Sequence, residues 1–253
     1  MTRFRCDLHI HSCLSPCGDD EATPASIAGM AKLNGLDVAA LTDHNACGNC
    51  PAFFRACEAY GVTPVAGMEL TTAEDIHLVC LFPTLADAMR FESAVREKRI
   101  PVKNRPEIFG RQLVMNENDE TVGEEAHLLI NATLLSLSEA AALARSFGGA
   151  AFPAHIDRES NGLLAVLGGF PTEPAFSAAE LHDRGNIPAY MAQYGLSGKR
   201  IVTSSDAHRL IDVAEGENAC ELTLDADAND AQAVRDALIR YLGGGDAAER
   251  KNA

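Results

Sequence analysis

Residues 7–12, DLHIHS, alternate side chains that ionise or bind metals with apolar side chains. Successive side chains of a strand point to opposite faces, so His9 and His11 are expected to share one face while Leu8 and Ile10 share the other. A strand that only supplied a hydrophobic core would have little use for two adjacent imidazoles. The stretch therefore raises the question of which other groups join them.

Short apolar segments recur along the chain, and most are separated by stretches of helical period. The first helix is signalled by Thr23 as N-cap, Pro24 at its first position and Gly35 as terminator. Repeated strand–helix units favour a parallel sheet, open or closed into a barrel. The expected strands are 4–10, 36–42, 62–67, 76–82, 149–155, 178–182 and 200–205, and the expected helices about 24–35, 52–60, 85–98, 139–147 and 230–242.

The length of 253 residues and the hydrophobic content of 47% allow one large core. We expect a single domain over residues 1–242 and a flexible tail over 243–253. Residues 99–126 break the strand–helix rhythm with Pro101, Pro106, Gly110 and an acidic run. This segment predicts a short inserted cap or loop.

The charge balance of 21 basic and 36 acidic residues, net −15, argues against a broad surface that neutralises nucleic-acid phosphates. The negative charge does not argue against a small phosphorylated ligand that is bound through metal ions. No apolar run reaches the roughly 18 to 20 residues of a membrane span, and the first residues do not resemble a signal peptide. We therefore expect a cytoplasmic protein without membrane contact, whose eight cysteines are reduced.

Side chains able to bind metals lie at or just past the carboxyl ends of the expected strands. In a parallel barrel these ends open onto one face, where active sites are built. Imidazole nitrogen together with carboxylate oxygen suits zinc, manganese or iron. The groups outnumber the ligands of one tetrahedral ion, so two or three ions are expected. These groups are His9 and His11, Asp43 and His44, Glu69, His155, and Asp206 and His208.

The ordered motifs HxH (9–11), TDHN (42–45), GMEL (67–70), AHID (154–157) and SDAH (205–208) make the chain resemble the PHP superfamily. This superfamily comprises polymerase-associated and histidinol-phosphatase-like metal-dependent phosphoesterases. The resemblance runs from Arg5 to about Leu224, and segments 11–24, 153–158 and 204–208 are similar to a subgroup of small stand-alone bacterial members. It implies an α/β fold, a distorted seven-stranded (β/α)7 barrel with a short inserted cap or loop and up to three metal ions.

The resemblance also implies a ligand set. It assigns a first ion to His9, His11, Glu69 and Asp206, a second to Glu69, His77 and His155, and a third to His44, His208 and Asp19. Asp20 is the alternative to Asp19, because the loop after the first strand is longer than the simplest family pattern.

Several other residues are open to more than one interpretation. His77 begins its strand, so only the resemblance supports it as a ligand, and His127 is its rival. His182 matches no ligand of the pattern and is expected to be structural or to support a ligand. Asp7 and Asp43 are expected to orient metal ligands by hydrogen bonds rather than to bind metal, and a role as an N-terminal loop cap is the alternative for each.

The four cysteines near the first two motifs, Cys13, Cys17, Cys47 and Cys50, permit a thiolate site at the barrel mouth. Their spacing matches no standard iron–sulfur run, which favours reduced cysteines instead. No disulfide is required by either interpretation.

Together these features predict hydrolysis of phosphoric esters by a hydroxide that bridges two divalent ions. Glu69, Asp206 and His208 are the expected catalytic residues, and Arg158 and Arg209 the expected phosphate contacts. The expected substrate is small: a nucleotide, a nucleoside bisphosphate or an oligonucleotide end. Histidinol phosphate, a non-catalytic metal-binding scaffold and amidohydrolase-type C–N hydrolysis are the alternatives, and the sequence does not indicate an oligomeric state.

Overall fold

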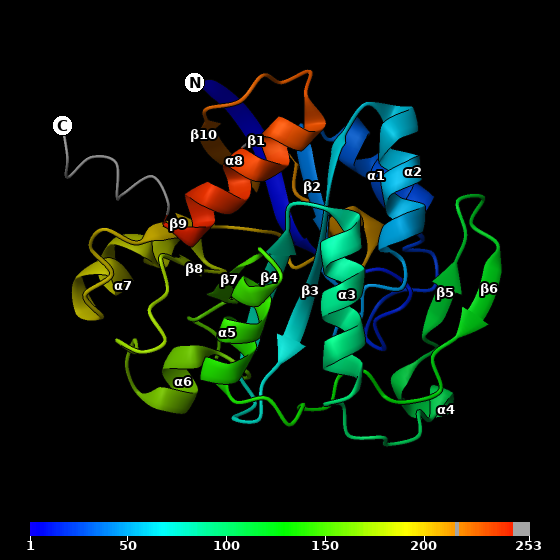
Figure 1. The fold of residues 1–253 in the computed structure, drawn as a ribbon, viewed down its shortest axis with the longest axis horizontal. Helices are drawn as coiled ribbons and strands as arrows, with labels where there is room; N and C mark the ends of the chain where they lie inside the picture. The colour runs from blue at the N-terminus through cyan, green and yellow to red at the C-terminus, as the bar shows by residue number, and fades with distance from the viewer. Residues whose placement is uncertain (216–217, 245–253) are drawn as a thin grey trace.

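The structure, a computed structural model, describes residues 1–215 and 218–244. Its centre is a curled six-stranded sheet in the order β10-β1-β2-β3-β4-β7 (Figure 1). The strands of this sheet are β1 (Thr2–Ile10), β2 (Val38–Leu41), β3 (Thr63–Thr71), β4 (His77–Phe82), β7 (Ala150–Pro153) and β10 (Cys220–Leu224).

The strands of the sheet do not all run the same way. β1, β2 and β3 are parallel, β4 is antiparallel to β3, and β7 is antiparallel to β4 and so runs with β3. The strand β10 pairs antiparallel with β1 at the far edge. A separate parallel pair, β8 (Ala178–Glu180) and β9 (Arg200–Val202), lies beyond β7.

The sheet approaches closure without completing it. The Ile156 N–H donates to the Glu180 carbonyl at 2.9 Å, and Ile10 forms an isolated parallel bridge with Ala207. Each expected strand segment contains a strand, but within the described residues these strands form no single seven-stranded sheet. The fold is α/β with a curled sheet consistent with a PHP barrel, and the expected regular (β/α)7 arrangement is not confirmed.

The helices flank the sheet, and their ends carry the expected caps. Thr23 accepts from the Ser26 N–H at the start of α1, and Ser136 forms a capping box with Glu139 at the start of α5. The helices are α1 (Pro24–Leu33), α2 (Cys50–Tyr60), α3 (Leu85–Arg96), α4 (Pro106–Phe109), α5 (Leu137–Ser146), α6 (Leu163–Leu167), α7 (Ile187–Gln193) and α8 (Ala231–Gly243), with 3-10 turns η1 (Arg184–Asn186) and η2 (Leu210–Asp212).

Two hydrophobic layers divide the core. The inner layer collects side chains from all six strands of the sheet and from β8 and β9, and α8 packs against it through Leu238. The outer layer packs α1, α2, α3 and α5 against the other face of the sheet. Figure 1 shows α8 beside the N-terminal end of β1, so the interior is covered at that end. The opposite end of the interior is where β1 to β3 terminate.

A shift in register between β1 and β2 changes the direction of the side chains in the DLHIHS stretch. Leu8 packs in the inner layer, but Ile10 packs in the outer one, against the regular alternation expected for β1. The pairing of β1 with β2 shifts between Asp7 and Ile10, as in a β-bulge, which redirects the following side chains. His9 and His11 consequently point into the mouth of the curled sheet.

The segment 99–126 is an ordered cap rather than an open loop. It contains α4 and the antiparallel pair β5 (Leu113–Met115) and β6 (Thr121–Glu124). Gln112 anchors it, because its side chain is buried and accepts from the Leu129 N–H at 2.8 Å. At the other end of the chain α8 extends to Gly243, and residues 245–253 of the expected tail lie outside the described residues.

Membrane insertion by a helix finds no support in the fold. Across residues 1–215 and 218–244 no helix combines the length and the apolar character needed to cross a bilayer.

Candidate metal centre

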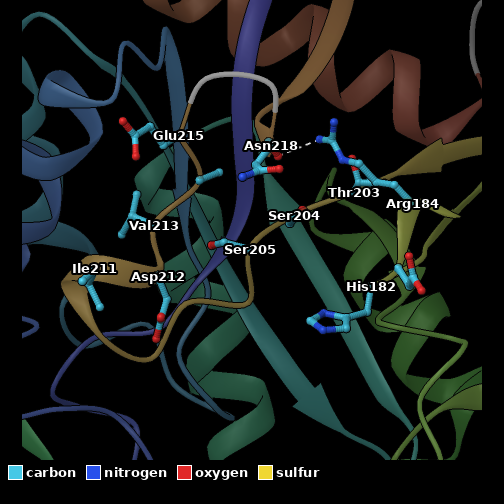
Figure 2. Close-up of a pocket in the computed structure, with 12 residues that line it drawn as sticks. His182, Arg184, Thr203, Ser204, Ser205, Ile211, Asp212, Val213, Glu215 and Asn218 are labelled. Atoms are coloured by element: carbon cyan, nitrogen blue, oxygen red, sulfur yellow. Dashed lines mark hydrogen bonds between the residues drawn. The ribbon is translucent and has the colours of Figure 1, made fainter.

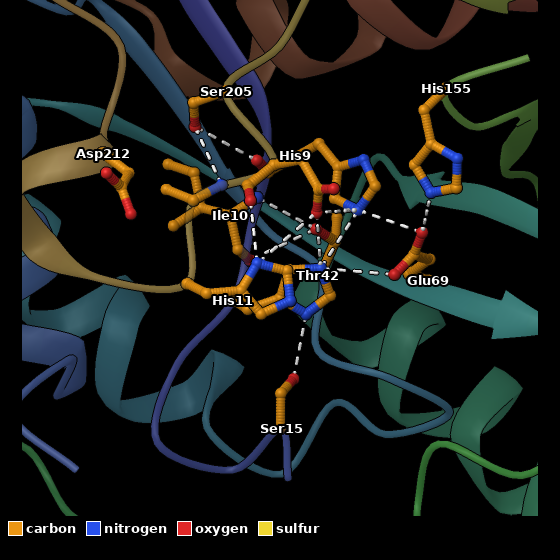
Figure 3. Close-up of polar contacts among 12 residues, drawn as sticks. His9, Ile10, His11, Ser15, Thr42, Glu69, His155, Ser205 and Asp212 are labelled. Carbon is orange, nitrogen blue, oxygen red and sulfur yellow. Dashed lines mark hydrogen bonds and ion pairs between the residues drawn. The ribbon is translucent and has the colours of Figure 1, made fainter. Parts of the chain in front are cut away.

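Six of the eight histidines meet two carboxylates at the mouth of the curled sheet. Glu69, on β3, is the centre of this cluster: its carboxylate oxygens lie 2.8 to 3.3 Å from nitrogens of five imidazoles. Figure 3 shows His9, His11 and His155 turned toward Glu69. Three sets of side chains place their ligand atoms within 4.8 Å of one another: His9, His11, Glu69 and Asp206; His44, Glu69 and His77; and His11, His44 and His208.

The antiparallel direction of β4 explains why His77 belongs to this cluster. In the pairing of β3 with β4, Thr71 faces His77, so the beginning of β4 lies at the end of β3. The His77 Nδ1 is 2.8 Å from Glu69 Oε1 and 3.3 Å from His155 Nε2. His77, at the beginning of its strand, thus reaches the same mouth of the sheet as the ligands at the carboxyl ends of the other strands.

Hydrogen bonds fix which nitrogen of His9 and His11 carries a proton. His9 Nδ1 donates to the buried Glu180 carboxylate at 3.0 Å. The Ser15 hydroxyl donates to Asp43 at 2.7 Å, so at 2.9 Å from His11 Nδ1 it must accept the imidazole N–H. In their neutral forms, both imidazoles therefore turn an unprotonated Nε2 toward the centre of the cluster.

When both imidazoles are neutral, the nitrogen and oxygen atoms that meet at this point carry lone pairs with no proton between them. The two Nε2 atoms lie 3.1 Å apart, and each lies 3.1 to 3.3 Å from oxygens of Glu69 and Asp206. Asp206 Oδ1 is buried and has no hydrogen-bond partner. Lone pairs held this close repel unless a cation lies among them. The donor set fits a divalent ion bound by imidazole and carboxylate.

Electrostatics in the metal-free cluster show the same need for positive charge. Burial opposes protonation of His11, but hydrogen bonds and charge from Asp206 and Glu69 outweigh it and raise the pKa of His11 to about 9. Burial also raises the pKa of Glu69, yet the surrounding imidazoles hold it well below its usual value. Burial and the charge of His11 lower the pKa of His208 to about 4. The cluster thus collects positive charge around its two carboxylates.

Backbone strain coincides with the cluster. His155 and Asp206 have φ values of 27° and 52°, a region that side-chain-bearing residues seldom occupy. Asn45, directly after His44, has a φ of 48° and fixes its turn by donating to the Leu129 and Asn131 carbonyls. Strained positions of this kind gather where the fold must aim functional side chains.

Comparison with known families identifies the fold that carries this cluster. The family model described as the PHP domain matches residues 7–144, which is more than half of the chain. The chain belongs to the PHP family. None of the curated proteins gives a significant match to the sequence.

Solved structures share the PHP fold at low sequence identity. The lesion-specific endonuclease EndoQ of Pyrococcus furiosus aligns at a TM-score of 0.62 and 20% identity over 96% of this chain, but the chain spans only 57% of that protein. A protein of Bifidobacterium adolescentis assigned as a metal-dependent phosphoesterase aligns at 0.58 and 17%, covering 93% and 96% of the two chains. A Chromobacterium violaceum amidohydrolase with bound sulfate aligns at 0.55 and 18%, covering 83% and 89%.

In this PHP chain the two aspartates expected to steer ligands act through serines. Asp43 accepts from the hydroxyls of Ser12 and Ser15, both at 2.7 Å, and Ser15 in turn contacts His11. Asp7 accepts from the Ser205 hydroxyl at 2.6 Å and from its N–H at 3.0 Å. Asp7 therefore holds the backbone just before Asp206.

Three residues weighed as ligands lie outside the cluster. Asp19 is exposed, and its carboxylate accepts from the Glu21 N–H at 2.9 Å, so only its backbone, bonded to the His208 carbonyl, reaches the site. The alternative Asp20 is also exposed. His127 is exposed on the cap beside Glu125. The place expected for Asp19 is filled by His11 in the set formed with His44 and His208.

The two arginines expected at the phosphate differ in position. Arg158 lines a cavity of about 210 Å³ together with members of the cluster, and it pairs with Asp206 through Nη1. Arg209 is exposed and binds Asp212 at 2.7 and 2.8 Å instead. The structure therefore brings Arg158 to the site and leaves Arg209 at the surface.

The four cysteines form no thiolate site. The thiols of Cys47 and Cys50 both donate to the Gly67 carbonyl, and that of Cys13 to the Leu113 carbonyl. Burial, with nearby carboxylates, raises the pKa of Cys13 to about 12, which keeps its thiol protonated. Cys17 is exposed and lines the cavity beside the cluster. All eight cysteines of the chain are unpaired.

Glu180 is a residue of the site that the sequence did not reveal. Its side chain is buried in β8 and accepts from His9 Nδ1–H at 3.0 Å and from the His155 N–H at 3.1 Å. It thus sets the tautomer of one expected ligand and the position of another. The available signal was a glutamate between alanines and leucine in a short apolar strand, where a carboxylate needs a partner.

Replacing Glu180 by glutamine is expected to weaken metal binding about 10- to 100-fold while the fold persists, because a carboxylate behind a metal-bound imidazole raises its basicity. Dissociation constants for Mn²⁺ and Zn²⁺ from calorimetric titration measure this effect. Glu139→Gln, at the exposed cap of α5, is the matched control and should bind metal as the wild type does. Equal affinity in both variants would contradict this role.

Proposed function

We propose that the chain is a divalent-metal-dependent phosphoesterase that hydrolyses a small phosphorylated substrate: a nucleotide, a nucleoside bisphosphate or an oligonucleotide end. The observation that carries the proposal is the convergence of the His9 and His11 Nε2 atoms on Glu69 and Asp206. PHP membership and the shared fold of a protein assigned as a metal-dependent phosphoesterase point to the same chemistry.

The side chains of the cluster can hold two or three ions, and zinc, manganese and iron all accept this donor set. Glu69 is common to two of the three sets and His11 to two. When bound, such ions polarise phosphoryl oxygens and lower the pKa of water. We assign the same side chains the role of placing the phosphoryl group, with Glu69, Asp206 and His208 nearest the reaction.

Arg158 is the residue we assign to the phosphate. It contributes to the cavity beside the cluster, and its guanidinium already engages a carboxylate, Asp206. A guanidinium presents paired N–H groups that match phosphate oxygens. In our proposal Arg158 exchanges Asp206 for the substrate phosphate once positive charge satisfies Asp206.

The charge of the chain favours a small substrate. A net charge of −15 opposes wide contact with a phosphate backbone. We propose a cytoplasmic location as well, because eight unpaired cysteines suit a reducing compartment.

Phosphate release from a panel of phosphomonoesters, measured with Mn²⁺ or Zn²⁺ and after chelation, tests the proposal. The panel contains p-nitrophenyl phosphate, AMP, a nucleoside 3′,5′-bisphosphate and histidinol phosphate. We expect metal-dependent release that Asp206→Ala and His11→Ala both abolish. Wild-type rates in both variants would rule out the site, and a protein that binds metal but releases no phosphate would point to a scaffold.

A further inference from the structure

A second cavity, of about 610 Å³, adjoins the metal centre. Arg158 connects the two: its Nη1 pairs with Asp206, and its Nη2 lies 3.1 Å from Nδ1 of His182, which lines the second cavity. Ser205, another lining residue, directly precedes Asp206 in the chain. Figure 2 shows His182 and Asp212 on either side of this space, with Ser204 and Ser205 between them. A group that leaves the phosphate at the cluster would thus have an adjacent place to occupy.

The contact with Arg158 determines what His182 can offer. A guanidinium only donates hydrogen bonds, so Nδ1 of His182 accepts and, in the neutral ring, Nε2 carries the proton. The backbone of His182 is held in place because its N–H donates to the Asp157 carboxylate at 2.8 Å. His182 therefore offers a hydrogen-bond donor to an oxygen of the ligand.

The remaining lining is acidic and hydroxylic. It includes the carboxylates of Asp183, Asp212 and Glu215, and Arg184, the one arginine among the described lining residues, donates to the Asn218 carbonyl. Among residues 1–215 and 218–244 no Phe or Tyr lines the cavity, so this part of the lining has no broad ring on which a nucleobase could stack. This balance opposes a second phosphate and favours a ligand whose hydroxyl groups donate to carboxylates.

Ser204 supplies an independent sign of a missing ligand. It is 9% exposed and lines the cavity, and its hydroxyl has no hydrogen-bond partner. A buried hydroxyl without a partner costs free energy, and such groups are uncommon in folded proteins. A polar atom of a ligand in the cavity would give the Ser204 hydroxyl a hydrogen-bond partner.

We propose that this cavity binds the alcohol part of the substrate and that this alcohol is a neutral, hydroxyl-rich group such as a sugar or polyol. The inference rests on the proposed hydrolysis of phosphoric esters but changes its substrate class, from nucleotides to sugar or polyol phosphates. Catalytic efficiency is therefore expected to be about tenfold or more higher for ribose 5-phosphate, glucose 6-phosphate or glycerol 3-phosphate than for AMP or a nucleoside bisphosphate, as one or two added hydrogen bonds imply.

Steady-state kinetics of the Mn²⁺-loaded protein with these esters, p-nitrophenyl phosphate and ethanolamine phosphate test the inference. Ser204→Ala should raise KM for the preferred sugar phosphate about three- to tenfold more than it raises KM for p-nitrophenyl phosphate. Glu215→Gln should reduce the discrimination against the bisphosphate. Ser93→Ala, an exposed serine on α3, is the matched control.

The outcomes separate this inference from the function beneath it. A protein that cleaves p-nitrophenyl phosphate yet prefers the bisphosphate or AMP, or whose preference is insensitive to Ser204→Ala, overturns the sugar assignment alone. Preference for ethanolamine phosphate overturns it in favour of a cationic alcohol. A protein that cleaves none of these esters overturns the phosphoesterase function and this inference with it.

Discussion

Glu69→Gln should remove at least one bound ion per molecule and lower phosphate release about a thousandfold or more, since ions in such sites contribute several kcal/mol to the barrier. Glu69 lies within 3.3 Å of five of the six imidazoles of the cluster, so its negative charge acts on all of them but His208. Glutamine keeps the volume of the side chain but is neutral and turns an N–H₂ group toward ligand nitrogens. The loss therefore measures ligation rather than packing.

Metal content by mass spectrometry and phosphate release by the same preparation check the Glu69 variant. Glu221→Gln, which removes the same charge from an exposed position on β10 that forms an ion pair with Arg3, is its control and should keep both the metal content and the rate. A Glu69→Gln protein with a full complement of ions and a rate within tenfold of wild type would show that the cluster is not the site of reaction.

The sequence placed most ligand side chains correctly because they follow the strand patterns, although β3 runs on to Thr71 and β9 stops at Val202, not at the expected 67 and 205. His9, His11, Glu69, His155 and Asp206 were placed at one mouth from strand endings alone. His77 could not be placed that way, since strand direction depends on pairing between distant segments. Only the antiparallel β4 shows why a residue at the beginning of a strand faces Glu69.

Features that depend on tertiary context were not visible in the sequence. The register shift in β1, which turns His9 and His11 inward, arises from its pairing with β2. The edge strand β10 alternates buried and exposed residues in only five positions, too short a pattern to separate from a loop. Glu180 was missed because its two partners, His9 and His155, are distant in the chain.

The metal-free protein is expected to be most stable near pH 6.5, the ordinary pKa of histidine. The pKa of His11 is raised to about 9 in the folded state, so its contribution is complete below pH 6.5 and disappears as the pH rises through 9. The difference between these two pKa values corresponds to about 3 kcal/mol in the free energy of unfolding. The pKa of His208 is lowered to about 4, so the stability it supports is lost as the pH falls from 6.5 toward 4.

Bound ions should reverse the alkaline part of this dependence, because they need the unprotonated imidazoles that high pH supplies. At a free Mn²⁺ concentration about a thousandfold above the dissociation constant, binding adds about 4 kcal/mol, or roughly ten degrees in melting temperature for a domain of this size. Calorimetric melting of loaded and chelated protein from pH 6 to 9 should show this gap widening as the pH rises. His11→Gln should flatten the fall in the metal-free protein, whereas His127→Gln, on the exposed cap, should leave it unchanged. A gap that stays constant or narrows toward pH 9 would mean that the ions do not displace protons from these imidazoles, and would locate metal binding elsewhere in the molecule.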